Sequence, residues 1–130
     1  MKIAKLETFT KSYVSFVKVT DTENNSGYGQ MSTYHADITA QIFHKQVAPW
    51  VLGKPWYDFE DIENLVLEKE HKFPGSYVLR AMAGLDTALW DMKGKIENKP
   101  IVSLIGGTPG KLRVYGSSMK RDIEPIKEAE

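Results

Sequence analysis

The sequence predicts an α+β fold in which a three-stranded antiparallel meander is followed by a helical bundle. Residues 2–9 and 13–20 have the alternating pattern and the β-branched and aromatic content of strands, and a third strand is expected at about 28–33. Three helical patterns come next along the chain, and the last of them is the longest. Strands in one part of the chain and helices in the next favour an α+β fold.

Short polar connections join the three predicted strands. Residues 10–12 separate the first two strands, and residues 23–27 are expected to form a hairpin turn because asparagine and glycine tolerate positive φ angles. Connections this short join neighbouring antiparallel strands.

The first two helices are predicted from apolar residues on one side and from residues that favour helix ends. Apolar residues of the first helix are Ala36, Ala40, Phe43, Val47 and Trp50. Pro49 is expected to help end this helix. Asp58 is the expected N-cap of the second helix, whose acidic first turn suits the positive end of the helix dipole.

The longest helical pattern carries one apolar stripe, with residues recurring at steps of three and four. Its members are Val78, Met82, Leu85, Leu89, Met92 and Ile96. Ser76 is the predicted N-cap, and the run 98–100, Asn-Lys-Pro, is the predicted stop. A short helical turn over 101–105 then ends at Gly106-Gly107. This spacing alone indicates a core helix and says nothing about chemistry.

Composition excludes several classes of function. The chain has 17 Lys and Arg residues against 17 Asp and Glu, so its net charge does not favour binding to nucleic acid. It contains no cysteine, which excludes disulfides and thiolate chemistry. No run approaches the ~18 apolar residues of a membrane span, so a soluble cytoplasmic protein without a membrane partner is expected.

The residue order of the long helix carries a resemblance. Residues 81–95 read AMAGLDTALWDMKGK, and the pairs Pro100-Ile101 and Leu104-Ile105 follow before Gly106. This order resembles the N-terminal signature of the mandelate racemase/muconate lactonizing enzyme family of the enolase superfamily. The match spans the whole signature, with Met92 where Leu, Ile or Ala is usual.

The resemblance implies how the chain is organised. Residues 1–110 would form an enolase-like N-terminal capping domain, and residues 111–130 the first βα unit of a TIM-type (β/α) barrel. That unit would consist of a strand over 112–118 and a helix from Glu124. Since a barrel needs eight such units over roughly 250 residues, the chain is expected to be truncated.

The resemblance also implies the chemistry. Members abstract the proton α to a carboxylate, and a bound Mg²⁺ stabilises the enediolate that forms. The metal ligands and the bases are expected beyond Glu130, so no catalytic or metal-binding residue is assigned within this chain. Asp86 and Asp91 lie on different faces of one helix and are expected to be surface or interface charges. Residues 1–130 alone are expected to be inactive.

The resemblance implies candidate substrate-binding residues in two loops of the capping domain, which in this family close over the barrel mouth, and in the barrel strand. The first loop, over 10–12, is unusually short and contains Lys11, and the second contains Tyr34 and His35, which can hydrogen-bond a polyhydroxylated substrate. Ser117 and Lys120 are expected at the C-terminal end of the barrel strand, where TIM barrels hold their active sites. An ordinary exposed loop residue remains the alternative for each.

The short first loop and the polar second loop resemble those of acid-sugar dehydratases more than the hydrophobic lid of an aromatic-acid racemase. The resemblance therefore implies an acid-sugar dehydratase, whose partner would be a small-molecule carboxylate such as a sugar acid. A racemase or epimerase and a lactone-forming cycloisomerase share the same half-reaction and remain alternatives. A second alternative is a non-catalytic, capping-like binding module. The resemblance further implies that the full-length protein is a homo-oligomer.

Overall fold

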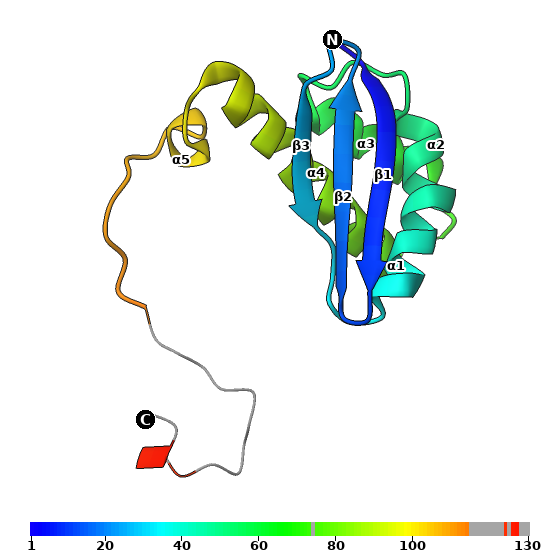
Figure 1. The fold of residues 1–130 in the computed structure, drawn as a ribbon. Helices are drawn as coiled ribbons and strands as arrows, with labels where there is room; N and C mark the ends of the chain where they lie inside the picture. Colours follow the sequence, from blue (N-terminus) through cyan, green and yellow to red (C-terminus); the bar gives the residue numbers. More distant parts are fainter. Residues whose placement is uncertain (74, 115–123, 125, 128–130) are drawn as a thin grey trace.

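The computed structural model describes residues 1–73, 75–114, 124 and 126–127, and it contains one antiparallel sheet (Figure 1). The strands β1 (Ile3–Lys11), β2 (Val14–Asp21) and β3 (Ser26–Gln30) lie side by side in the order β1-β2-β3. The predicted three-stranded meander is therefore confirmed.

Strands β1 and β3 differ from the predicted strands by two or more residues at three of their ends. Strand β1 continues through Lys11, which pairs with Val14, so the connection is a two-residue turn and not residues 10–12. Ser12 begins this turn with a left-handed φ of 51°. Strand β3 begins at Ser26, earlier than the predicted start at about residue 28, and ends at Gln30 instead of residue 33.

The early start of β3 is explained by the buried carboxylate of Asp21. Its Oδ1 accepts the backbone N–H groups of Glu23 and Asn25, both at 2.9 Å. These bonds close the turn within four residues, because they satisfy the amides that a longer loop would leave unpaired. Burial would raise the pKa of Asp21, but the hydrogen bonds from Asn25 and Glu23 outweigh it and hold this pKa below its usual value.

The first predicted helix is a continuous helical segment with a widened middle. It consists of α1 (Ala36–Ile42), the π-helical η1 (Phe43–Val47) and α2 (Ala48–Val51). Pro49 does not end the helix, as expected from the sequence, but lies in the first turn of α2. Proline has no N–H to bond to the preceding turn, and here it stands just after the π-helical segment, where the regular i→i−4 bonding is already interrupted.

Helix α3 (Phe59–Lys69) begins as predicted. The side chain of Asp58 accepts the N–H of Asp61 at 3.3 Å and caps the helix. At the other end, Glu70 accepts hydrogen bonds from the Trp50 indole at 2.6 Å and from the Gln46 amide at 2.8 Å. These bonds tie the end of α3 to the preceding helical segment.

Helix α4 (Ser76–Glu97) is the longest helix among the described residues, and the predicted stripe is buried from Val78 to Met92, with Ile96 partly buried at its end. Ser76 is not its N-cap: Gly75 holds that position, and no side chain caps this end. Asn98 ends the helix in a left-handed conformation with φ 50°, as expected from the stop signal. The short helix α5 (Ile101–Leu104) then leads to Gly106, which also has a positive φ of 82°.

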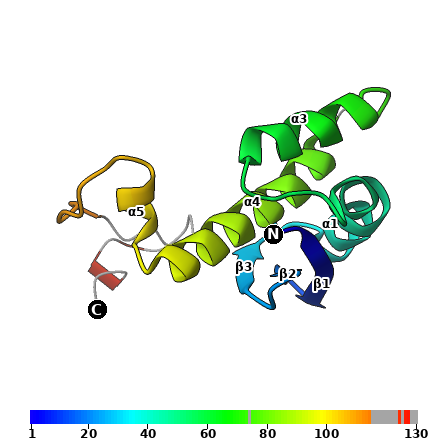
Figure 2. The ribbon, with the colours of Figure 1, turned by 90° about the horizontal axis from the view of Figure 1, so that it is seen from above.

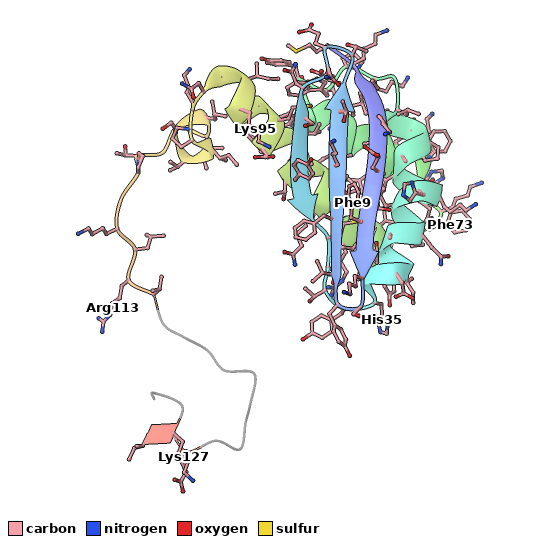
Figure 3. The ribbon with its side chains drawn as sticks, in the orientation of Figure 1. Phe9, His35, Phe73, Lys95, Arg113 and Lys127 are labelled. Carbon is pink, nitrogen blue, oxygen red and sulfur yellow. The ribbon has the colours of Figure 1, made fainter. Side chains whose placement is uncertain are left out.

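The layers of the domain are visible from above (Figure 2). Helix α4 lies across one face of the sheet, and α3 lies on the other side of α4. The inner face of β2 is buried, with Val17 and Val19 fully covered, whereas Phe9 and Phe16 on the outer face are 54% and 38% exposed. Figure 3 labels Phe9 on this face. The core therefore lies between the sheet and the helices.

The C-terminal expectations fall mostly outside the described residues. Residues 112–114 are exposed and belong to no strand, and the rest of the predicted strand 112–118 is not described. Of the predicted helix from Glu124, one hydrogen bond is described, from the N–H of Lys127 to the carbonyl of Glu124. The barrel unit stays a prediction. Within the described ranges, no helix has the length and apolar character to cross a membrane.

Candidate functional site

The two predicted loops lie at the same end of the sheet. The turn after β1 and the segment that follows β3 are both at this end, where Figure 3 labels His35. The N–H of Met31 donates to the carbonyl of Ser15 at 2.8 Å, so the second segment starts beside the first residues of β2. We call this region the loop end, meaning residues 11–13 and 31–35.

The first part of the loop end is a tight turn with exposed side chains. Lys11 is the last residue of β1 and is exposed. Tyr13 is 78% exposed at the tip of the turn, although the sequence did not single it out. A two-residue turn is too short to fold over a neighbouring surface as a long lid would, so only its side chains can extend from this part of the loop end.

The second part of the loop end has an ordered backbone. The N–H of Tyr34 donates to the hydroxyl of Ser32 at 3.2 Å, which forms a local turn. His35 has a left-handed backbone, φ 50° and ψ 52°, and its carbonyl accepts the N–H of Thr39 at 2.9 Å. The Tyr34 side chain is 64% exposed, and His35 is exposed. Both side chains are available to a ligand.

Helix α4 adds two side chains that the sequence did not indicate. Arg80 donates from Nη1 to the Ser32 hydroxyl at 2.6 Å. The Tyr77 ring lies 6.4 Å from the His35 ring, measured between ring centroids. These contacts join positions more than 40 residues apart, and no local sequence pattern reports such a contact.

The remaining candidates, Ser117 and Lys120, lie outside the described residues. The structure therefore brings Lys11, Tyr34 and His35 to one end of the domain and leaves the other two untested.

The two aspartates of α4 contact other elements of the domain. Asp91 accepts the backbone N–H of Tyr28 at 2.8 Å and pairs with Lys95 at 2.6 Å, while Lys95 also reaches the carbonyl of Ser26 at 3.4 Å. Together they cover backbone groups on the open edge of β3. Asp86 lies in a mostly apolar setting between α3 and α4, and burial raises its pKa.

No group of three or more His, Cys, Asp or Glu side chains in the described ranges is arranged to hold a metal ion. Asp91 is also engaged by an amide and an ammonium group, which would compete with a metal ion for its oxygens. The loop end offers hydroxyl, imidazole and ammonium groups, which can form hydrogen bonds with a polar ligand.

A sheet covered on one face by a long helix, with its loops gathered at one end, defines an α+β capping domain. The chain belongs to the mandelate racemase/muconate lactonizing enzyme family, because the model of that family's N-terminal domain matches residues 1–106.

Individual relatives agree with this assignment. The chain is similar to a D-galactonate dehydratase family member of Paenibacillus sp. strain JDR-2, with 32% identity over 117 residues, 88% of this chain and 29% of the relative. A crystal structure from Roseobacter denitrificans, provisionally named a racemase, matches with a TM-score of 0.91 and 56% identity, over 99% of this chain and 35% of that chain.

A third relative was solved with a metal ion. The mandelate racemase/muconate lactonizing protein from Paracoccus denitrificans PD1222, complexed with magnesium, matches with a TM-score of 0.74 and 29% identity, over 82% of this chain and 30% of that chain. The present chain therefore spans about a third of the length of these relatives.

Proposed function

We propose that this chain is the N-terminal part of a Mg²⁺-dependent enzyme that abstracts the proton α to a carboxylate, and that the enzyme is an acid-sugar dehydratase. The observation that carries the proposal is the match of the N-terminal domain model over residues 1–106. The similarity to a D-galactonate dehydratase family member supports a sugar acid as substrate.

In this proposal residues 1–110 are the capping domain and residues 111–130 begin the barrel. The loop end faces the substrate, where the Lys11 ammonium group and the polar groups of Tyr34 and His35 bind its hydroxyl or carboxylate groups. Ser117 and Lys120 would contact the substrate from the barrel side. Specificity would thus come from this chain, while the bases and metal ligands come from the part of the relatives that it does not match.

The proposed cofactor is Mg²⁺, which stabilises the negative charge that develops on the substrate carboxylate. The magnesium complex of the Paracoccus relative supports this choice. The described residues contribute by excluding water and orienting the substrate, since no carboxylate cluster among them fits the ion.

The test uses the complete open reading frame that contains residues 1–130. The purified protein, with Mg²⁺, is offered a panel of five- and six-carbon sugar acids, and formation of the 2-keto-3-deoxy product is followed. We expect dehydration of at least one acid and its loss when the metal is chelated. Dehydration of none of them would refute the dehydratase assignment.

A racemase or epimerase is the second candidate, because the relative with 56% identity bears that provisional name. A lactone-forming cycloisomerase shares the same first half-reaction. Incubation in deuterated water separates these outcomes: a racemase or epimerase exchanges the α-proton and inverts the centre without loss of water, whereas a dehydratase releases the β-hydroxyl.

A non-catalytic binding module would leave every acid in the panel unchanged with the complete protein. The isolated chain gives the complementary measurement. We expect residues 1–130 alone to catalyse no α-proton exchange, and exchange by this chain would contradict the assignment of the bases to the unmatched part. Light scattering of the complete protein would test the expected homo-oligomer.

A further inference from the structure

The bond between Arg80 and Ser32 joins the long helix to the loop end. The guanidinium Nη1 of Arg80 lies 2.6 Å from the Ser32 hydroxyl oxygen, a short distance typical of a bond in which the donor is charged. Arg80 lies in the second turn of α4, whose other side is anchored in the core by Val78 and Met82. The cation therefore extends from a fixed support.

The Ser32 hydroxyl uses its full hydrogen-bonding capacity. It accepts from Arg80 and from the N–H of Tyr34 at 3.2 Å, and its own proton points to the carbonyl of Tyr34 at 3.4 Å. A hydroxyl has one donor and two acceptor sites, so all three are occupied. This arrangement fixes the rotation of the serine side chain and, through it, the turn that carries Tyr34.

The two ends of the segment are held independently of Arg80. Met31 is buried and bonded to the carbonyl of Ser15, and the carbonyl of His35 accepts the N–H and the hydroxyl of Thr39. Loss of Arg80 would thus release the middle of the segment and leave its ends and the core intact. The proximity of the Tyr77 and His35 rings shows that α4 also lies beside the end of the segment.

We propose that Arg80 is a positioning residue: by holding Ser32 it fixes the conformation in which residues 32–35 present Tyr34 and His35 to the substrate. This inference rests on the proposed function, in which the loop end contacts the substrate. A guanidinium is suited to the task because its planar donor group holds a fixed direction, whereas a lysine ammonium is a mobile point charge.

The experiment compares Arg80→Ala and Arg80→Lys in the complete enzyme, with Lys72→Ala as a matched control. Lys72 is also an exposed cation, but it lies in the connection between α3 and α4 and makes no described hydrogen bond to Ser32. The first readout is hydrogen–deuterium exchange of the peptide that spans residues 31–36. The second is the separate effect on KM and kcat, and the third is the melting temperature.

For Arg80→Ala we expect about tenfold faster exchange in this peptide and a KM raised about tenfold, with kcat within about twofold of the parent. The melting temperature should stay close to that of Lys72→Ala, and Arg80→Lys should recover part of the KM. If Arg80 had only a structural role, its replacement would lower the melting temperature and would not raise KM selectively over kcat.

Unchanged exchange or an unchanged KM in Arg80→Ala would overturn the proposal. Tyr34→Phe and His35→Ala distinguish the reason for an unchanged KM. If they raise KM and Arg80→Ala does not, the role of Arg80 alone is wrong. If none of the three changes KM while the enzyme still turns over substrate, the proposed role of the loop end is wrong as well.

Discussion

Helix α4 packs against two neighbours in different ways. Its contact with β3 is made by backbone against backbone: a Cβ on Gly29 would overlap the carbonyl oxygen of Gly84 and lie 2.7 Å from the nitrogen of Ala88. Its contact with α3 is made by side chains, among them Ile62 and Leu85. Where two backbones touch there is no room for a Cβ atom, so the position requires glycine. Side chains in contact can instead adjust by changing rotamers.

The first prediction removes the backbone contact. Gly29→Ala should lower the free energy of unfolding by about 3 kcal/mol, the upper part of the range for overpacking, because helix and strand must move apart. Gly75→Ala is the control, since its extended backbone accepts any residue and a Cβ there meets no atom within 4 Å. Urea unfolding of residues 1–130 measures both. A loss below about 1 kcal/mol for Gly29→Ala would show that this contact adapts like the α3 contact.

The second prediction concerns the edge of the same interface. Asp91→Ala removes the acceptor of the Tyr28 N–H and the partner of Lys95, and should cost about 1.5 kcal/mol, since both bonds involve a charged group that is partly exposed. Glu97→Ala is the control, because Glu97 pairs only with Lys99, at 3.4 Å, among the interactions described. Equal losses in urea unfolding would show that Asp91 is an ordinary surface charge.

The third prediction addresses the α3 side. Asp58→Ala removes the capping carboxylate of α3 and should cost about 1 kcal/mol, whereas Asp58→Asn keeps an acceptor and should cost a few tenths, about 0.3 kcal/mol. Exchange of the α3 amides should rise more than exchange of the α4 amides. If α4 responds equally, the two contacts belong to one cooperative unit and the comparison fails.

The sequence predicted the features that depend on residues close to one another in the chain. The strand order, the buried stripe of α4, the Asp58 cap and the stop at Asn98 follow from neighbouring residues and are confirmed. The Ser76 cap and the helix end at Pro49 were wrong because both depend on backbone angles at one residue, which residue type only biases.

The long-range contacts could not be predicted. Gly27 was expected in the hairpin turn and Gly29 in the third strand, and only the position of α4 on β3 explains why both residues are glycine. The bond from Arg80 to Ser32 likewise depends on how the helix is rotated on the sheet. Of the candidate site, the shared location of Lys11, Tyr34 and His35 followed from topology, while Ser117 and Lys120 stay predictions.

The last prediction has the smallest expected effect and tests whether water reaches the contact between α3 and α4. Asp86 lies there beside apolar side chains, and burial raises its pKa above the ordinary value. The folded state therefore holds the proton of Asp86 more tightly than the unfolded state does. The stability that this proton contributes is fully present below the unfolded pKa of about 3.9, and it is lost as the pH rises through the raised pKa of the folded state.

The side chain of Asp86→Asn cannot ionise, so this variant does not lose stability as the pH rises. After allowance for solvent screening, the variant should be more stable than the parent by about 0.5 kcal/mol at pH 7, and this difference should shrink below about pH 4. Glu68→Gln, which removes an exposed charge on α3, is the control. If Asp86→Asn differs from the parent by the same amount at both pH values, the carboxyl is hydrated, and the α3 contact is open to water in a way that the glycine contact with β3 is not.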